Sequence, residues 1–277
     1  MPETHKLFSH LPALQNMIRR VAIEAGNITL DYFDEGGFND AKTKKDGSPV
    51  TLADEAAEKL IIEKLIAIAP GISIVGEESV AKGRTYDLTR SEWFWLVDPL
   101  DGTKEFISGR GDYTVNIALI HKGVPVMGVV YAPVHGELYA GHKDGGAIKW
   151  NNDSDKEKPI AVREPPEKGL VAVCSKSHGR GERLDQFLNH YKIAKRASRG
   201  SSLKMCLVAE GKADIYPRLG PTCEWDTAAA HAVLNAAGGR ITDLNGTVLS
   251  YGGHDPKFLN PEFVAYSAAL NLPENFS

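Results

Sequence analysis

The feature that most restricts the fold is a run of five apolar residues, Trp-Phe-Trp-Leu-Val, at positions 93–97. No polar residue alternates with them, so the run predicts a strand that is buried on both faces. Asp98-Pro99 follows directly. Because proline has no N–H to donate to a neighbouring strand, we expect this strand to end there.

The rest of the chain predicts a mixture of helices and strands. Apolar residues at helical spacing and helix-stop signals predict helices over 11–32, 51–69, 181–191, 202–210 and 227–237. Short apolar stretches predict strands over 72–75, 113–121, 124–131, 137–140, 160–162 and 170–174. Such a mixture indicates an α/β or α+β fold built in layers.

The most polar segment, residues 151–159, is expected to act as a linker. It divides the chain into two predicted domains. The first, 1–160, would be an N-terminal α+β domain that carries most of the acidic candidate residues. The second, 161–277, would be a C-terminal α/β domain.

Composition excludes several classes of protein. The 277 residues carry a formal net charge of −4, which argues against a partner that is a nucleic acid polymer. No stretch approaches the ~18 apolar residues of a transmembrane segment, and the N-terminus lacks the apolar run of a signal peptide. Three cysteines without a C-x-x-C pair predict reduced thiols. We therefore expect a cytoplasmic protein; peripheral contact with the cytoplasmic face of the inner membrane and the oligomeric state stay open.

Asp98 and Asp101 are the sharpest chemical signal. Two carboxylates three residues apart, on a turn at the end of a buried strand, repel each other unless a cation lies between them. Carboxylate oxygens and a backbone carbonyl are ligands that Mg²⁺ accepts. Gly102-Thr103 then allows a tight turn and a helix start, whose N–H groups could hold a phosphate. The alternative is an ordinary surface turn rich in Asp and Gly.

Three further acidic positions lie where predicted elements begin or end. Glu77 follows the strand at 72–75, although adjacent glutamates often only solvate a loop. Asp226 precedes the helix at 227–237, where it could act purely as the N-cap. Asp54 could form a capping box with Thr51.

Together these positions predict a shared site. Glu77, Asp98, the Leu100 carbonyl, Asp101 and Asp226 could hold two metal ions, with Asp54 and Thr103 orienting and deprotonating a water molecule. This arrangement is typical of two-metal hydrolysis of a phosphate ester by in-line attack.

The same residues form motifs that resemble the inositol monophosphatase superfamily. The resemblance rests on residues 95–106, WLVDPLDGTKEF, and 224–231, EWDTAAAH. Lys104-Glu105-Phe106, where inositol phosphatases usually carry Thr-Asn-Phe, favours the 3′(2′),5′-bisphosphate nucleotidases of the bacterial CysQ type. Residues 47–54, 76–78 and 200–211 also match that type.

The resemblance implies a sugar-phosphatase fold of alternating helix and sheet layers. It implies a phosphoric monoester hydrolase that converts adenosine 3′,5′-bisphosphate to AMP and phosphate, removes a by-product of sulfur assimilation, and is sensitive to lithium. Two or three Mg²⁺ ions would be held by the five ligands above, and Asp54 and Thr103 would activate the water. The substrate would contact Glu77, Leu100, Asp101, Gly102, Thr103, His178, Ser201, Lys204, Arg218 and Asp226.

Two rival functions remain at this point. One is a different substrate within the superfamily, either an inositol monophosphate or fructose 1,6-bisphosphate. The other is a sensor that binds metal or nucleotide without catalysis. The presence of every expected acidic residue argues against such a sensor.

Overall fold

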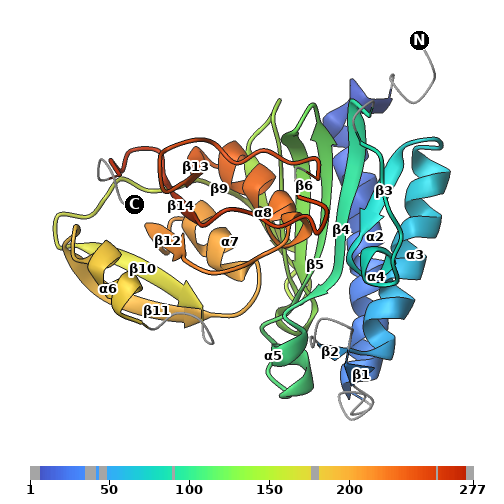
Figure 1. Ribbon diagram of the computed structural model, residues 1–277, viewed down its shortest axis with the longest axis horizontal. Helices are drawn as coiled ribbons and strands as arrows, with labels where there is room; N and C mark the ends of the chain where they lie inside the picture. The colour runs from blue at the N-terminus through green and yellow to red at the C-terminus, as the bar shows by residue number, and fades with distance from the viewer. Residues whose placement is uncertain are drawn as a thin grey trace.

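The computed structural model describes residues 7–34, 42–43, 49–88, 91–175, 181–253 and 255–272 (Figure 1). Its helices are α2 (Leu11–Asp34), α3 (Leu52–Ile68), α4 (Glu77–Ala81), α5 (Thr103–Ile107), α6 (Glu182–Leu188), α7 (Leu203–Ala209) and α8 (Glu224–Ala236), with a 3₁₀ turn η2 (Pro133–His135).

The strands form one large sheet, one smaller sheet and a short hairpin. The seven-stranded sheet follows chain order: β3 (Ser73–Gly76), β4 (Trp93–Asp101), β5 (Thr114–His121), β6 (Val124–Ala132), β7 (Glu137–His142), β8 (Ala147–Asn151) and β9 (Lys156–Ile160). The five-stranded sheet has the order β11 (Ile193–Arg199), β10 (Leu170–Ser175), β12 (Ile215–Arg218), β14 (Phe263–Ser267) and β13 (Gly239–Asp243). β1 (Lys42–Thr43) pairs with β2 (Pro49–Val50).

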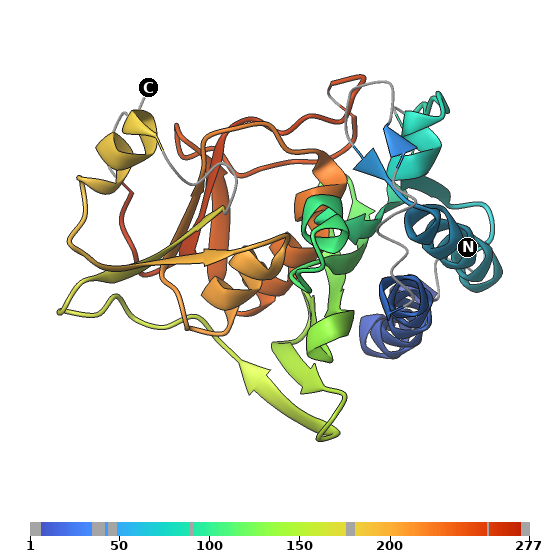
Figure 2. The ribbon, with the colours of Figure 1, turned by 90° about the horizontal axis from the view of Figure 1, so that it is seen from below.

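The elements lie in layers, as the sequence predicts (Figures 1 and 2). α2 and α3 cover one face of the seven-stranded sheet, and α8 covers the other face, between the two sheets. Trp95 and Val97 of β4 belong to the core formed with α2 and α3. Phe94 and Leu96 belong to the core formed with α8. Alternate side chains of the apolar run are thus buried on opposite faces, which explains why the run contains no polar residue.

Several predicted boundaries need correction. β4 does not end at Asp98-Pro99 but continues to Asp101. Its pairing with β5 is irregular between Asp98 and Asp101, so the missing N–H of Pro99 interrupts no regular ladder. The polar segment 151–159 is not a plain linker, because β8 and β9 form a hairpin across it. β9 is an exposed edge strand, and lysine and proline are compatible with such an edge.

Three further expectations concern the cysteines, membrane-spanning segments and the division into domains. The three cysteines are free thiols. In the part of the chain that the structure describes, no helix combines the length and the apolar character needed to cross a bilayer. The division into domains at residue 160 remains a prediction.

Close packing of α8 on the large sheet depends on Gly128. A Cβ atom at this position of β6 would lie 2.1 Å from the carbonyl oxygen of Ala229 in α8. Only a residue without a side chain lets helix and strand backbones approach this closely. This contact brings the first turn of α8 to the region where β3 and β4 end.

We predict that Gly128→Ala destabilises the protein, because a methyl group there must push α8 away from β6. Overpacking of this kind costs about 1–3 kcal/mol. Urea unfolding followed by circular dichroism measures the change. Gly146→Ala is the matched control, because a Cβ there meets no atom within 4 Å. Equal unfolding midpoints for both variants would contradict the role given to Gly128.

Candidate active site

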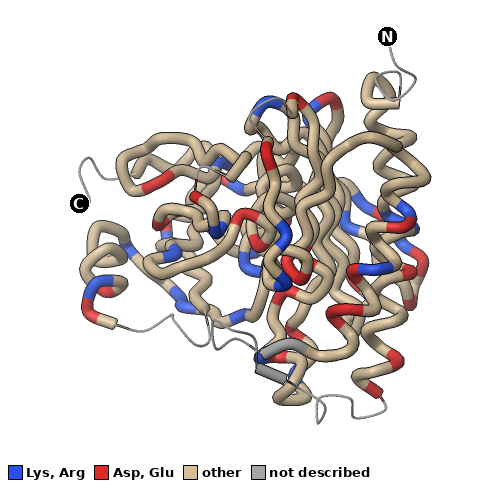
Figure 3. The backbone as a smooth tube through the Cα atoms, turned by 45° about the vertical axis from the view of Figure 1, so that its right-hand side comes forward, with Lys and Arg blue, Asp and Glu red and all other residues tan. Residues whose placement is uncertain are grey.

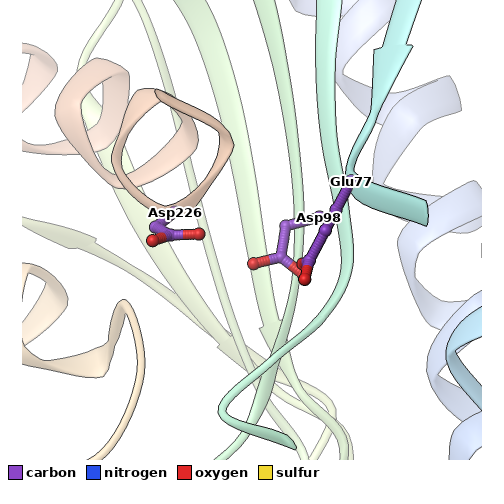
Figure 4. A group of neighbouring side chains, drawn as sticks. All are labelled: Glu77, Asp98 and Asp226. Atoms are coloured by element: carbon purple, nitrogen blue, oxygen red, sulfur yellow. The ribbon is translucent and has the colours of Figure 1, made fainter. Parts of the chain in front are cut away.

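Three acidic side chains from separate segments meet at one end of the large sheet. β3 and β4 are parallel neighbours, with Gly76 opposite Val97, so the residues that follow, Glu77 and Asp98, lie side by side. Asp226 faces them from the first turn of α8 (Figure 4). One carboxylate oxygen from each of Glu77, Asp98 and Asp226 lies within 4.8 Å of the others. The geometry is therefore that of a group able to hold a metal ion.

The electrostatics of this cluster favour a cation. Burial raises the pKa of Asp98 well above its ordinary value of 3.8, and the charges of Glu77, Asp101 and Asp226 raise it further. Burial also raises the pKa of Asp226, with Asp101 and Glu77 adding to the effect. The pKa of Asp101 is raised by burial and lowered in part by Lys204. Bringing these carboxylates together without a cation is thus unfavourable.

Asp226 is not the N-cap residue that the sequence suggested. α8 begins at Glu224, with Cys223 as its N-cap, and Asp226 occupies the third helical position. Its Oδ2 accepts a hydrogen bond from the Cys223 N–H at 2.8 Å. The helix starts earlier because this reciprocal capping box satisfies its first turn. Capping occupies one carboxylate oxygen and leaves the other available to a ligand.

Asp54 lies at the start of α3 and does form the predicted capping box with Thr51. Its Oδ2 accepts hydrogen bonds from the Thr51 N–H at 2.8 Å and from the Thr51 hydroxyl at 2.6 Å. Thr103 begins α5, and its hydroxyl donates to the Leu100 carbonyl at 3.4 Å. Gly102 precedes it with φ of 99°, a conformation that favours glycine. Joint action of Asp54 and Thr103 on one water stays a prediction.

A pocket next to the carboxylates joins residues of the two sheets. Asp101, Gly102 and Asp226 line it from the acidic side. Ser201, Lys204 and Arg218 line it from the side of the smaller sheet. These six residues are among those that the family resemblance implies as substrate contacts, and they surround one cavity.

The cations of this pocket are held by backbone carbonyls. Lys204 is 6% exposed, and its Nζ donates to the Ser201 carbonyl at 2.5 Å. Burial lowers the pKa of Lys204 to about 8. Arg218 donates from Nε to the Gly220 carbonyl at 3.2 Å and from Nη2 to the Pro221 carbonyl at 2.7 Å. Both side chains are therefore fixed in the pocket wall.

Ser201 has an unusual backbone and an unsatisfied hydroxyl. Its φ of 47° is uncommon for a residue with a side chain. Its buried Oγ has no hydrogen-bond partner among the described residues. An unsatisfied polar group in a pocket wall suits contact with a ligand. His178, the remaining candidate, lies outside the described residues.

Sequence reasoning missed three polar residues that support the site. Glu58 of α3 accepts hydrogen bonds from the N–H groups of Glu78 and Ser79 at 2.8 and 2.9 Å, and so caps the helix that begins with Glu77. Asn116 and Ser202 contact Asp101. Asn116 could have been noticed as the one amide within the apolar stretch 115–120, whereas Glu58 and Ser202 carry no comparable signal.

Comparison with known proteins agrees with this geometry. The model of the inositol monophosphatase family matches residues 12–272. The "3′(2′),5′-bisphosphate nucleotidase CysQ" of Shigella flexneri is 44% identical over 252 residues, covering 90% of this chain and 97% of the relative. The protein of the same name from Escherichia coli strain K12 is 43% identical with the same coverage.

A solved structure extends the similarity to the fold. CysQ from Bacteroides thetaiotaomicron, a bacterial member of the inositol monophosphatase family, superimposes with a TM-score of 0.76 at 35% identity, covering 91% of this chain and 95% of that one. The acidic cluster, the layered fold and these matches lead to one conclusion. This chain belongs to the inositol monophosphatase family.

Proposed function

We propose that this protein is a Mg²⁺-dependent 3′(2′),5′-bisphosphate nucleotidase that hydrolyses the 3′-phosphate of adenosine 3′,5′-bisphosphate. The observation that carries the proposal is that Asp226 of the acidic cluster lines the same pocket as Lys204 and Arg218. The acids suit a metal ion, and the two cations suit a second phosphate that is not cleaved. The names of the similar nucleotidases support this choice of substrate.

The residues present fit magnesium. The cluster consists of carboxylates whose ionised forms are destabilised by burial and by one another, and oxygen ligands of this kind are those that Mg²⁺ accepts. We assign Glu77, Asp98, the Leu100 carbonyl, Asp101 and Asp226 as ligands for two or three ions. Bound Mg²⁺ would supply charge stabilisation for the phosphate oxygens and acidify a water molecule. Metal dependence, generally on Mg²⁺, is common to this family.

The chain's own residues would orient the reaction. Asp54, buried at the start of α3, would accept the proton of the attacking water, and the Thr103 hydroxyl would orient that water. The segment from Leu100 to Thr103 would contact the cleaved phosphate, because α5 begins there beside the acidic cluster. Fixed groups of this kind reduce the reorganisation needed to reach the transition state.

Residues from the second half of the chain would determine the specificity for a nucleotide. Lys204 and Arg218 would contact the 5′-phosphate, Ser201 would donate its unsatisfied hydroxyl, and His178 would contact the base or ribose. Inositol monophosphate offers no second phosphate to these cations. Fructose 1,6-bisphosphate does, and it is therefore the closer competitor.

A small soluble substrate agrees with the charge distribution. In the view of Figure 3, Lys and Arg residues of the described chain alternate with Asp and Glu and form no continuous basic stripe. A stripe of that kind is typical of proteins that follow a nucleic acid backbone. A cytoplasmic location is part of this proposal.

The function is tested by measuring phosphate release with and without Mg²⁺. We expect release from adenosine 3′,5′-bisphosphate only with Mg²⁺, and much slower release from inositol 1-phosphate and fructose 1,6-bisphosphate. If inositol 1-phosphate or fructose 1,6-bisphosphate is hydrolysed faster, the proposed substrate is wrong and that compound is preferred. Nucleotide binding without turnover of any of the three would favour the sensor alternative.

The acidic cluster also predicts how stability depends on pH without metal. A carboxyl group whose pKa is raised on folding binds its proton more tightly in the folded state than in the unfolded state. Its stabilising contribution to the free energy of unfolding is therefore complete below pH 3.8 and is lost as pH rises through the raised pKa. Asp98→Asn has no carboxyl group at this position, so we expect it to avoid the loss of stability that accompanies ionisation of Asp98. The substitution should also weaken the charge repulsion on Asp101 and Asp226. In EDTA the variant should gain stability relative to wild type as pH rises above 3.8, by about 1.4 kcal/mol for each unit by which folding raises the pKa of Asp98.

Urea unfolding at several pH values measures this difference. His231 is buried and its pKa is lowered to about 3, so it also makes stability depend on pH. Because both proteins contain His231, its effect cancels in the difference between them. A difference between the two proteins that does not vary with pH would contradict the repulsion. Activity of the variant at saturating Mg²⁺ should fall by orders of magnitude, because a ligand charge is lost.

Substrate choice is tested on Lys204 and Arg218 separately. Lys204→Met and Arg218→Met should reduce kcat/KM for adenosine 3′,5′-bisphosphate far more than for adenosine 3′-monophosphate, which lacks the 5′-phosphate. Each lost charged contact costs roughly 1.5–3 kcal/mol, or about 10- to 150-fold in the ratio of efficiencies. Lys195→Met, on the exposed strand β11, is the control. If the ratio is unchanged in both variants, the 5′-phosphate is bound elsewhere.

A further inference from the structure

Ser202 contacts two of the proposed metal-binding residues at once. It is 1% exposed and lies directly before α7. Its backbone N–H donates to Asp101 Oδ2 at 2.6 Å, and its hydroxyl lies 3.0 Å from the same oxygen. The hydroxyl also lies 2.7 Å from the backbone carbonyl oxygen of Asp226, to which it can donate. One buried side chain thus connects the end of β4 with the first turn of α8.

Asn116 completes this arrangement from β5. Its side-chain amide donates to the Ser202 hydroxyl at 3.1 Å and reaches Asp101 Oδ2 at 3.5 Å. The amide is 1% exposed. Because Asn116 fills a lone pair of the Ser202 oxygen, the single hydroxyl hydrogen is left to point toward Asp101 or Asp226.

Every hydrogen bond described for the Asp101 carboxylate ends on Oδ2. That oxygen receives the Ser202 N–H, and the Ser202 hydroxyl and the Asn116 amide lie beside it. A carboxylate fixed through one oxygen cannot rotate freely, so its other oxygen, Oδ1, is the one left to coordinate a cation. Hydrogen bonds of this type to ligating groups set both their orientation and the affinity of the metal.

Local interactions also define the conformation of the segment that contains Ser202. Ser201 before it has φ of 47°, and Lys204 after it donates back to the Ser201 carbonyl. The same short segment therefore contacts Asp101 and Asp226 through Ser202, and its residues Ser201, Ser202 and Lys204 all line the pocket.

We propose that Ser202, supported by Asn116, is a positioning residue that fixes the Asp101 carboxylate so that Oδ1 faces the metal ion. The inference rests on the proposed role of Asp101 as a ligand within the proposed function. This role requires no contact of the Ser202 hydroxyl with substrate or with the attacking water. Its effect is exerted through the orientation of Asp101 and of the first turn of α8.

The test is Mg²⁺ binding to the full chain, measured by isothermal titration calorimetry without substrate. Ser202→Ala keeps the backbone N–H and removes the hydroxyl, and we expect Mg²⁺ to bind ~10- to 100-fold more weakly. Ser202→Thr retains a hydroxyl and should restore most of the affinity. Ser198→Ala, an exposed serine on β11, is the matched control and should bind Mg²⁺ as wild type does.

Two results would overturn the inference: wild-type affinity in Ser202→Ala, or an equal loss in Ser202→Thr and Ser202→Ala. If Ser202→Ala does not fold, Asn116→Ala carries the test, and unchanged Mg²⁺ affinity in that variant also overturns it. Failure of the proposed function looks different. A wild-type protein that binds Mg²⁺ but releases no phosphate from adenosine 3′,5′-bisphosphate refutes the substrate and leaves the Ser202 result standing.

Discussion

The packing of α8 against the seven-stranded sheet is the constraint on which the rest of the molecule depends. α8 lies between the two sheets and contributes to the core on the inner face of the larger one. Gly128 permits the contact, since any side chain there would meet the Ala229 carbonyl. With α8 held at this depth, Asp226 faces Glu77 and Asp98. A small shift of the helix would separate the three carboxylates, because a hydrogen bond or a metal ligand tolerates far less displacement than apolar packing does.

Bringing these carboxylates together raises the free energy of the folded state. Burial and mutual repulsion both raise the pKa values of Asp98 and Asp226. The surrounding protein offsets only part of this, through the Cys223 N–H on Asp226 and through Ser202 and Lys204 near Asp101. The remaining imbalance is what a divalent cation can relieve. Under the proposed function, the stability of the fold, the binding of metal and the reaction would all depend on the same few oxygens.

The layers, and the meeting of Glu77, Asp98 and Asp226, could be predicted from the sequence because both follow from local patterns. Five apolar residues in a row required a strand covered on both faces, and Glu77, Asp98 and Asp226 lay where predicted elements end or begin. Local patterns failed where pairing across the chain decides the outcome. β11 contains Lys195, Arg196 and Arg199 and is a strand because it pairs with β10. Pro99 lies within β4 because the pairing with β5 is already irregular there. The hydrogen bonds of Ser202 likewise depend on how α7 meets β4 and α8.

The order of the site residues along the chain has a consequence for biosynthesis. Glu77, Asp98 and Asp101 come early in the sequence, whereas Asp226 follows more than a hundred residues later. A ribosome extends the chain at about 5–20 residues per second, and N-terminal parts emerge first. The nascent chain therefore carries the early carboxylates for several seconds before the residue that completes the cluster exists. The complete cluster of Glu77, Asp98 and Asp226 forms only after α8 has emerged and docked, so a chain that stalls before Asp226 cannot acquire it.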